Sequence, residues 1–225
     1  MNGRARRVRV WDLPTRIFHW TLAVLVVFSF TTGKIGGDWM AWHLRSGYAV
    51  LTLVLFRIAW GFAGSETARF ARFLRGPRAA FSHAREVLAG RHAIAAGHTP
   101  LGGWMIVAML AAAAFQASTG LFSDDEIATQ GPLAVKVSNA MVSRMSSLHA
   151  IGQWVMVTLA VLHVAAIAFY RWRLGVRLVG PMVTGWSAFP LAQEPPRMRP
   201  AWIAILLVCA CAGAVWWLVE IYPMR

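Results

Sequence analysis

The sequence predicts an all-α integral membrane protein, in which a four-helix transmembrane bundle is followed by a fifth, C-terminal transmembrane helix. Apolar residues make up 58% of its 225 residues and charged residues 14%, whereas soluble domains average about 45–50% and about 25%. The apolar residues are concentrated in five runs, each near the length of about 20 residues that crosses a hydrocarbon core. We therefore expect each run to form one membrane span.

The spans are expected at residues 14–33, 42–63, 101–123, 145–170 and 201–219. Pro14 suits the first turn of a helix, and the last three runs contain no Asp, Glu, Lys or Arg. All five should be helical, because backbone polar groups inside lipid have to bond to one another. We expect residues 1–185 to form the four-helix domain and residues 186–225 to carry the fifth helix.

Most of the basic residues lie in three segments: before the first span, between the second and third, and between the fourth and fifth. Positive charge marks the cytoplasmic side of a membrane. We therefore expect the N-terminus in the cytoplasm and the C-terminus in the periplasm, with the chain in the inner membrane of a bacterium. A secretory signal is the alternative for the N-terminal segment, but no clean small-residue cleavage site follows it.

The net charge of +13 also raises nucleic-acid binding, which we reject because the arginines lie between apolar runs. The two cysteines, Cys209 and Cys211, are too close on one helix for an ordinary disulfide. No Cys-x-x-Cys-His occurs, which argues against covalently attached haem. No cysteine cluster is present for an iron–sulfur centre.

The connection over residues 70–90 alternates Phe, Leu and Ala with Arg. We expect either a short helix on the cytoplasmic membrane surface, broken at Pro77, or a solvated connector. Three histidines of the basic loop between the second and third spans, His83, His92 and His98, are expected in solvent and receive no role. We find no internal repeat.

Four further histidines lie inside or at the edge of the predicted spans, where ionisable side chains are costly and usually functional. They are His19, His43, His149 and His163. A single such histidine has a simple alternative, which is a hydrogen bond to a neighbouring helix. Four of them in one consistent geometry favour a shared function.

Helix geometry sorts these histidines into two pairs. His149 and His163 are 14 residues apart, so on one helix they share a face and lie about 21 Å apart along its axis. His19 comes early in a span that enters from the cytoplasm, and His43 opens a span that enters from the periplasm. Depth therefore pairs His19 with His163 near the cytoplasm and His43 with His149 near the periplasm.

Ligands that come in pairs favour haem over zinc. A structural zinc ion takes about four ligands at one point, whereas haem iron accepts one axial ligand on each face of the macrocycle. We therefore expect two b-type haems, and with them a haem-binding bundle.

Small and basic residues near the histidines are candidates to contact the macrocycles. Gly47 and Gly152 would leave room for them, although small residues also serve helix packing alone. Arg16 and Arg45 are candidates to bind haem propionates. Their alternatives are a positive-inside anchor for Arg16 and a snorkelling end residue for Arg45.

Three features resemble the bacterial cytochrome b561 family: residues 10–20 (Val-Trp-Asp-Leu-Pro-Thr-Arg-Ile-Phe-His-Trp), residues 39–48 around His43, and the spacing His149-x13-His163. That family includes the b-type cytochrome subunits of nickel–iron hydrogenases and is similar to the cytochrome b subunit of formate dehydrogenase. The resemblance covers roughly residues 8–185. The fifth span lies outside it.

The resemblance implies a four-helix core that holds two haem b groups, with ligands on the first, second and fourth helices. Mapped onto this sequence, the ligands are His19, His43, His149 and His163. Members of the family typically exchange electrons with membrane quinone, and many dock on a partner redox subunit.

We expect a dihaem cytochrome that transfers electrons between the quinone pool and a partner redox protein, as an electron-transfer subunit rather than a stand-alone enzyme. One alternative is a stand-alone membrane oxidoreductase of the superoxide:quinone type. Another is a non-redox membrane anchor whose histidines only pack. The acidic residues 124–126 are a candidate docking site for a basic partner such as a c-type cytochrome, and an ordinary solvated loop is the alternative. The remaining expected partner is membrane lipid; nucleic acid is not expected.

Overall fold

The computed structural model describes residues 5–90, 98–190 and 194–224. It divides into two compact units, which are described separately. Unit 1 comprises Met1–Phe18, Arg57–Ala108 and Ala160–Ala204, and unit 2 comprises His19–Phe56, Met109–Leu159 and Ile205–Arg225. The predicted domain boundary at residue 185 stays a prediction.

Within the described residues, five helical segments are long and apolar enough to cross a membrane. The helices are α1 (Leu13–Ile35), α2 (Met40–Ala63), α5 (Pro100–Gly120), α6 (Asn139–Arg173) and α8 (Ala201–Trp216). A short 3₁₀ turn precedes α2, and α8 continues through a π turn and a 3₁₀ turn to Met224. The five predicted helices are confirmed, with ends that differ by a few residues.

The largest difference is at the start of α6, which begins at Asn139 rather than at residue 145. Ser138 precedes the helix, and its side-chain oxygen accepts a hydrogen bond from the backbone N–H of Met141 at 3.4 Å. A capping side chain of this kind stabilises the first turn of a helix. The polar residues Ser143 and Arg144 interrupt the apolar run inside the helix, so hydropathy alone placed its start too late.

Short elements of unit 1 complete the chain. Strand β1 (Ala5–Arg9) pairs antiparallel with β2 (Trp186–Pro190), with Ala5 opposite Pro190 and Arg9 opposite Trp186. Val8, Val10 and Trp11 are buried there against Met182 of α7 (Val179–Thr184). This two-stranded sheet was not predicted.

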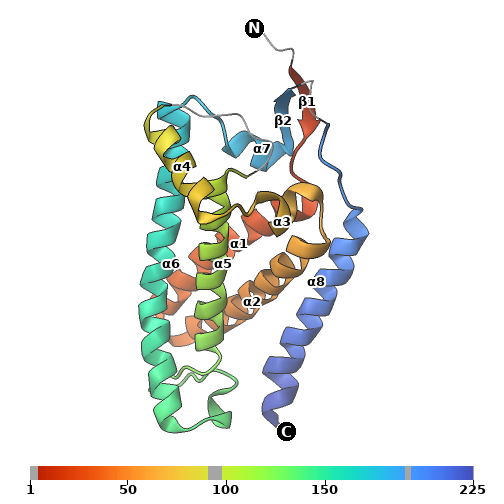
Figure 1. Cartoon of the computed structure of the whole chain (residues 1–225). Helices are drawn as coiled ribbons and strands as arrows, with labels where there is room; N and C mark the ends of the chain where they lie inside the picture. The colour runs from red at the N-terminus through yellow and green to blue at the C-terminus, as the bar shows by residue number, and fades with distance from the viewer. Residues whose placement is uncertain (1–4, 91–97, 191–193, 225) are drawn as a thin grey trace. The chain divides into compact units, whose positions relative to one another are not determined.

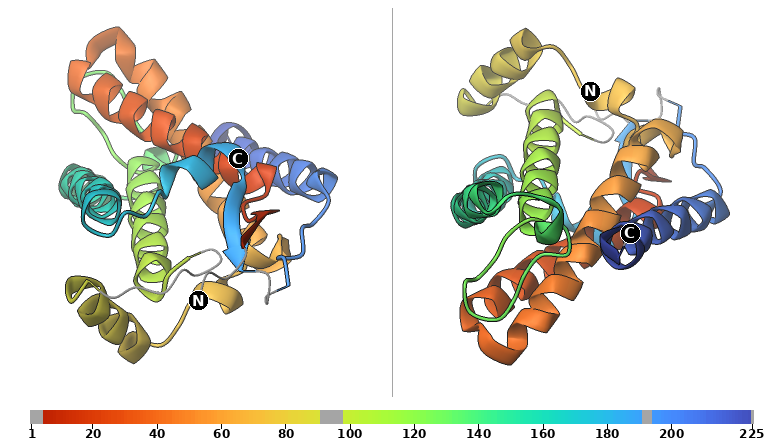
Figure 2. Two further views of the ribbon diagram at one scale, coloured as in Figure 1. Left: turned by 90° about the horizontal axis from the view of Figure 1, so that it is seen from above. Right: turned by 90° about the horizontal axis from the view of Figure 1, so that it is seen from below.

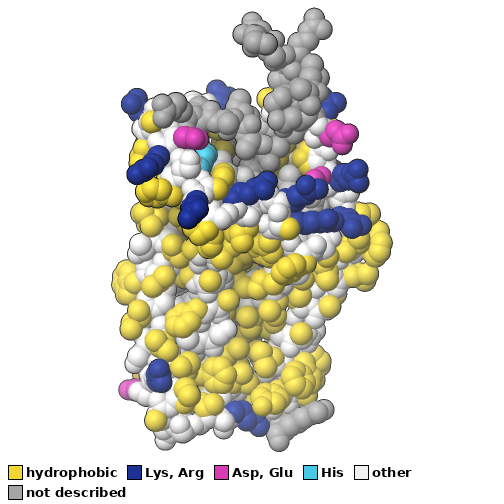
Figure 3. Space-filling view, viewed as in Figure 1, with side chains coloured by type: hydrophobic (Ala, Val, Ile, Leu, Met, Phe, Trp, Pro, Cys, Tyr) yellow, Lys and Arg dark blue, Asp and Glu magenta, His cyan; other side chains and the backbone are white. Residues whose placement is uncertain are grey.

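The connection after α2 forms two helices, α3 (Phe70–Phe73) and α4 (Pro77–Leu88). The predicted break at Pro77 therefore coincides with the start of α4. The guanidinium of Arg57 lies over the rings of Phe70 and Phe73, at 5.3 and 5.9 Å from their centroids. Lys and Arg side chains gather over α3 and α4 on the face shown in Figure 3.

Asp12 joins the start of α1 to the end of α2 in unit 1. One carboxylate oxygen accepts a hydrogen bond from the backbone N–H of Thr15 at 2.7 Å, which caps α1. The other accepts one from the indole N–H of Trp60 at 3.2 Å. Asp12 is only 4% exposed and Trp60 is fully buried, so these bonds are shielded from water.

The core of unit 2 is formed where four helices meet. Val50 and Val54 of α2 and Ala113 of α5 are buried together. Side chains packed against them come from α1, α5 and α6, and these are Leu22, Leu25, Val26, Ala114 and Met156. Many large side chains on the outer surfaces of the long helices are exposed apolar groups, as expected for a surface that lipid covers.

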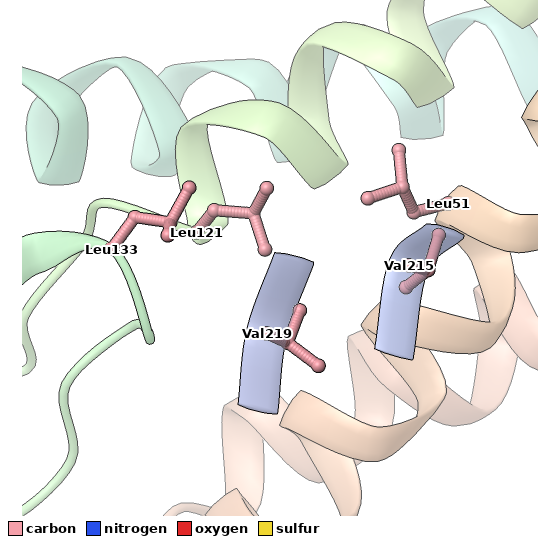
Figure 4. Close-up of a cluster of buried hydrophobic side chains, with 5 residues drawn as sticks. All are labelled: Leu51, Leu121, Leu133, Val215 and Val219. Carbon is pink, nitrogen blue, oxygen red and sulfur yellow. The ribbon is translucent and has the colours of Figure 1, made fainter. Parts of the chain in front are cut away.

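Helix α8 packs against unit 2 along α2 and the connection after α5. Val215 and Val219 are buried with Leu51 of α2 and with Leu121 and Leu133 of that connection, as Figure 4 shows. The view from below in Figure 2 shows the last turns of α8 beside α2. The fifth helix is therefore a packed part of this unit.

We expect Asp12→Ala to lower the free energy of unfolding by about 1–3 kcal/mol, because it removes a helix cap and leaves the buried Trp60 N–H without its acceptor. Thermal and denaturant unfolding in detergent measure this loss. Asp38→Ala is the matched control, because Asp38 is exposed before α2. Equal losses in both variants would contradict the role given to Asp12.

Candidate functional site

Two imidazole rings lie together in unit 2. His43 is in the first turns of α2, and His149 is on α6. Their ring centroids are 5.9 Å apart, and the ring planes are nearly perpendicular, at 86°. Both side chains are partly buried.

The ring of His43 is held by the backbone of α1. Its Nδ1 lies 2.8 Å from the carbonyl oxygen of Ser29 and 3.3 Å from the Ser29 hydroxyl. Gly33 lies one turn further along α1, and a Cβ at that position would be 2.7 Å from the same Nδ1. The ring therefore occupies space that only glycine leaves open.

The ring of His149 is held in the same way by α5. Its Nδ1 lies 3.0 Å from the carbonyl oxygen of Gln116 and 3.3 Å from the hydroxyl of Thr119. A Cβ at Gly120 would lie 2.9 Å from the ring carbon Cε1. In both cases the ring contacts a helix carbonyl and the glycine four residues after it.

These bonds fix which nitrogen carries the proton. A carbonyl oxygen only accepts, so the Nδ1 of each ring must be the N–H donor. In a neutral imidazole the Nε2 then keeps its lone pair, which is the form that binds a metal. An outer partner at the other nitrogen is the usual support of a metal-binding histidine.

Gln116 also reaches the Nε2 of His149. Its amide nitrogen lies 3.3 Å from that Nε2 and donates to the His149 carbonyl at 3.0 Å. Its amide oxygen is buried and, in the described part of the chain, accepts no hydrogen bond. A metal at this Nε2 requires the Gln116 amide to give way.

In the described residues, no group of three or more His, Cys, Asp or Glu is placed to hold a metal ion. Donors that occur in pairs do not make a four-ligand site, and they suit the two axial positions of a haem iron. With metal–imidazole bonds of about 2 Å, two axial rings have centres roughly 6 Å apart. The observed 5.9 Å fits this arrangement.

The profile of the prokaryotic cytochrome b561 family matches residues 10–185. The chain belongs to the prokaryotic cytochrome b561 family. It is accordingly an integral membrane helical bundle that binds b-type haem and works in electron transfer as a multi-pass membrane protein. No curated protein and no solved structure matches the chain.

The other histidines predicted as ligands of this cytochrome b561 lie in different units. His19 is in α1 in the part that belongs to unit 2, where its ring packs edge-on against Trp20 with centroids 4.9 Å apart. His163 is partly buried on α6 in unit 1. Their pairing stays a prediction.

The predicted glycines differ in their surroundings. Gly47 has open space where a Cβ would be, with nothing within 4 Å. At Gly152 a Cβ would collide with the amide oxygen of Gln116 and lie 3.4 Å from Phe115. Gly152 therefore makes room for the Gln116 side chain in this structure, and its contact with haem stays a prediction.

Arg16 and Arg45, the residues predicted to bind haem propionates, each contact another residue of the chain. Arg16 donates from Nη2 to the carbonyl of Val183 in unit 1, at the C-terminal turn of α7, where a cation is favourable. Arg45 is exposed, and its guanidinium lies 5.1 Å from the Trp42 ring centroid. Neither contact tests a role at haem, so both roles stay predictions.

The expectation that the loop histidines are solvated is wrong for two of them. The ring of His98 packs against Trp11 and Phe73, with centroids 4.5 and 4.6 Å apart. His83 hydrogen-bonds through Nε2 to the hydroxyl of Tyr170 at 3.1 Å. Nearby aromatic residues, which the charge pattern obscured, account for both contacts. His92 lies outside the described residues.

The acidic connection between α5 and α6 has internal partners. The carboxylate of Asp125 accepts backbone N–H bonds from Ile127, Ala128 and Thr129 at 3.0, 2.9 and 2.8 Å. These bonds lower the pKa of Asp125 from 3.8 to about 2, and the bond from Thr129 has the largest effect. The negative charge of Asp125 therefore stabilises the loop itself.

Because the folded pKa of Asp125 is depressed, its contribution to loop stability is complete above about pH 4 and is lost as the pH falls through about 2. Carboxyl-carbon NMR of the protein in nanodiscs should show this residue titrating near pH 2. Asp38, whose exposed carboxylate lies before α2, is the internal comparison. A midpoint for Asp125 at or above 3.8 would contradict the assignment.

Proposed function

We propose that this cytochrome carries two haems b and transfers electrons between the membrane quinone pool and a partner redox protein. The observation that supports it best is the pair of nearly perpendicular imidazoles, His43 and His149, each anchored through Nδ1. His43 and His149 would hold the periplasmic-side haem. His19 and His163 would hold the cytoplasmic-side haem.

The residues of the chain prepare the periplasmic-side site. The Ser29 and Gln116 carbonyls orient the two rings and keep the proton on Nδ1, so that each Nε2 keeps the lone pair that would bind iron once the Gln116 amide moves away from His149. Val50, Val54 and Ala113 are almost fully buried in the same unit and exclude water. Haem supplies a one-electron carrier when bound, and an apolar, dry surrounding tunes its potential.

The charge distribution supports the orientation that we propose. Unit 1 contains 17 of the 22 Lys and Arg residues, and its connections are the basic ones. By the positive-inside rule these connections lie in the cytoplasm. The N-terminus is then cytoplasmic, the C-terminus periplasmic, and the membrane is the bacterial inner membrane.

The quinone and the partner protein come from the chemistry of the family rather than from a contact in this chain. The acidic connection at residues 124–126 lies on the proposed periplasmic side, where the exposed Glu126 is available to a basic partner such as a c-type cytochrome. Helix α8 begins after the matched residues and packs on unit 2. We assign residues 1–185 to the haem domain and residues 186–225 to a segment that adds the fifth helix.

Purified protein should contain two haems b per chain by pyridine haemochrome assay. His43→Ala and His149→Ala should each lower the count to one and remove the same component of the reduced-minus-oxidised spectrum, because both remove a ligand of one iron. His163→Ala should remove the other component. His83→Ala is the control and should keep both haems, since in the described residues His83 hydrogen-bonds to Tyr170.

A wild-type chain with one haem or none would refute the dihaem proposal. Electron transfer is tested separately in vesicles. Added quinol should reduce the bound haems in the wild type, and the reduced protein should then pass electrons to a basic c-type cytochrome. Failure of quinol to reduce haem that is present would refute the quinone assignment alone. Turnover with superoxide and quinone in the absence of any partner would favour the stand-alone oxidoreductase instead.

A further inference from the structure

We infer that Thr32 and Thr119 are positioning residues that raise the reduction potential of the haem held by His43 and His149, because their hydroxyls share the carbonyl oxygens to which the two ligands donate. This inference rests on the proposed function, since it requires haem at these histidines. It concerns residues that act through the ligands and do not touch iron.

Thr32 shares the carbonyl that anchors His43. Its hydroxyl donates to the carbonyl oxygen of Phe28 at 2.8 Å and to that of Ser29 at 3.1 Å. The same Ser29 oxygen accepts the Nδ1–H of His43 at 2.8 Å. Thr32 is 1% exposed, so water does not compete for these bonds.

Thr119 shares the carbonyl that anchors His149, and its hydroxyl also lies 3.3 Å from the Nδ1 of that ring. Its hydroxyl donates to the carbonyl oxygens of Phe115 and Gln116, both at 3.0 Å. The Gln116 oxygen accepts the Nδ1–H of His149 at 3.0 Å. Thr119 is 4% exposed.

Residues 29–33 and 116–120 thus carry one arrangement, which we call the carbonyl–Thr–Gly motif. Its first residue supplies the carbonyl, its fourth is the threonine and its fifth is the glycine against which the ring packs. The two copies occur on different helices, α1 and α5, and serve the two rings of one pair. A single copy would be an ordinary helix feature, but its repetition at both rings indicates a shared function.

Threonines elsewhere on α1 and α2 show the ordinary hydrogen bond of a helical hydroxyl. The hydroxyls of Thr31 and Thr52 each donate to the carbonyl four residues earlier, at 2.9 Å. This is the usual way in which a helical threonine satisfies its hydroxyl. Thr32 and Thr119 add a second bond, to the carbonyl that the histidine uses.

A carbonyl oxygen that accepts two hydrogen bonds is a weaker acceptor for each of them than one that accepts a single bond. The sharing therefore limits the pull on the Nδ1 proton and keeps the imidazole from becoming more basic. A more basic axial ligand favours ferric over ferrous iron, so the shared carbonyl raises the potential. Removing the hydroxyl should reverse this effect.

The test is a spectroscopic redox titration of the full chain in nanodiscs. Thr32→Val and Thr119→Val should each lower the midpoint potential of one haem, the same haem in both, and the double variant should lower it further. The other haem should stay unchanged. Thr31→Val and Thr52→Val are matched controls with the same change of side chain, and they should leave both potentials unchanged.

Further variants guard the test against simple loss of the fold. Thr32→Ser and Thr119→Ser keep the hydroxyl and should restore the wild-type potential. Gly33→Ala and Gly120→Ala should remove or reorient one axial ring, and the ferric electron paramagnetic resonance spectrum should lose the strongly anisotropic low-spin signal that perpendicular axial imidazoles give. Gly213→Ala, on α8 at a position with open space, should keep it.

Unchanged or raised potentials in both valine variants, with haem content intact, would overturn the inference. Equal decreases in the Thr31 and Thr52 controls would do the same, because they would trace the shift to helix stability. Absence of haem from the wild-type protein would instead refute the proposed function, so the two failures are distinguishable.

Discussion

The hydrogen bond from an imidazole Nδ1–H to a helix carbonyl is the interaction on which the candidate site depends. It occurs twice in unit 2, from His43 to Ser29 and from His149 to Gln116. Each bond fixes the tautomer, ties a ring to a second helix and leaves the lone pair on the opposite nitrogen. Glycines 33 and 120 permit it, because a Cβ at either position would occupy the space of the ring.

This interaction also explains why the packing of unit 2 matters for function. The rings are held only if α1 lies against α2 and α5 against α6, and the buried cluster around Val50, Val54 and Ala113 supplies that packing. Helix α8 adds a second cluster on α2 and on the connection after α5. A helix outside the matched family residues therefore supports the elements that position the two histidines.

Much of the fold could be predicted from the sequence because its largest signal, long apolar runs, is local. All five long helices and their family were predicted, and the errors lie at helix ends such as Asn139, where polar capping decides. The β1–β2 pairing was not predicted, because it joins segments about 180 residues apart in sequence. Taken alone, the arginine-rich residues 4–9 resemble a charged tail, because nothing in that segment points to the strand with which residues 5–9 pair.

The candidate site was predicted in part for the same reason. Histidines inside apolar runs are conspicuous, since an ionisable group there needs a function. The residues that hold these histidines were not predicted, although a Thr-Gly pair starts three residues after the anchoring carbonyl in both helices, at Thr32-Gly33 and at Thr119-Gly120. The pair contacts a histidine only because of the helix that packs against it, and the sequence does not show which helix that is. Contacts such as Gln116 with Gly152 likewise exist only after the helices assemble.

An iron anomalous-scattering map of the crystallised, haem-loaded protein shows whether one iron lies between His43 and His149. We expect a peak between the two rings, next to the Nε2 of each, with the Gln116 amide moved aside. A peak bound to other side chains, or the two rings in contact with no iron between them in haem-replete protein, would contradict this expectation.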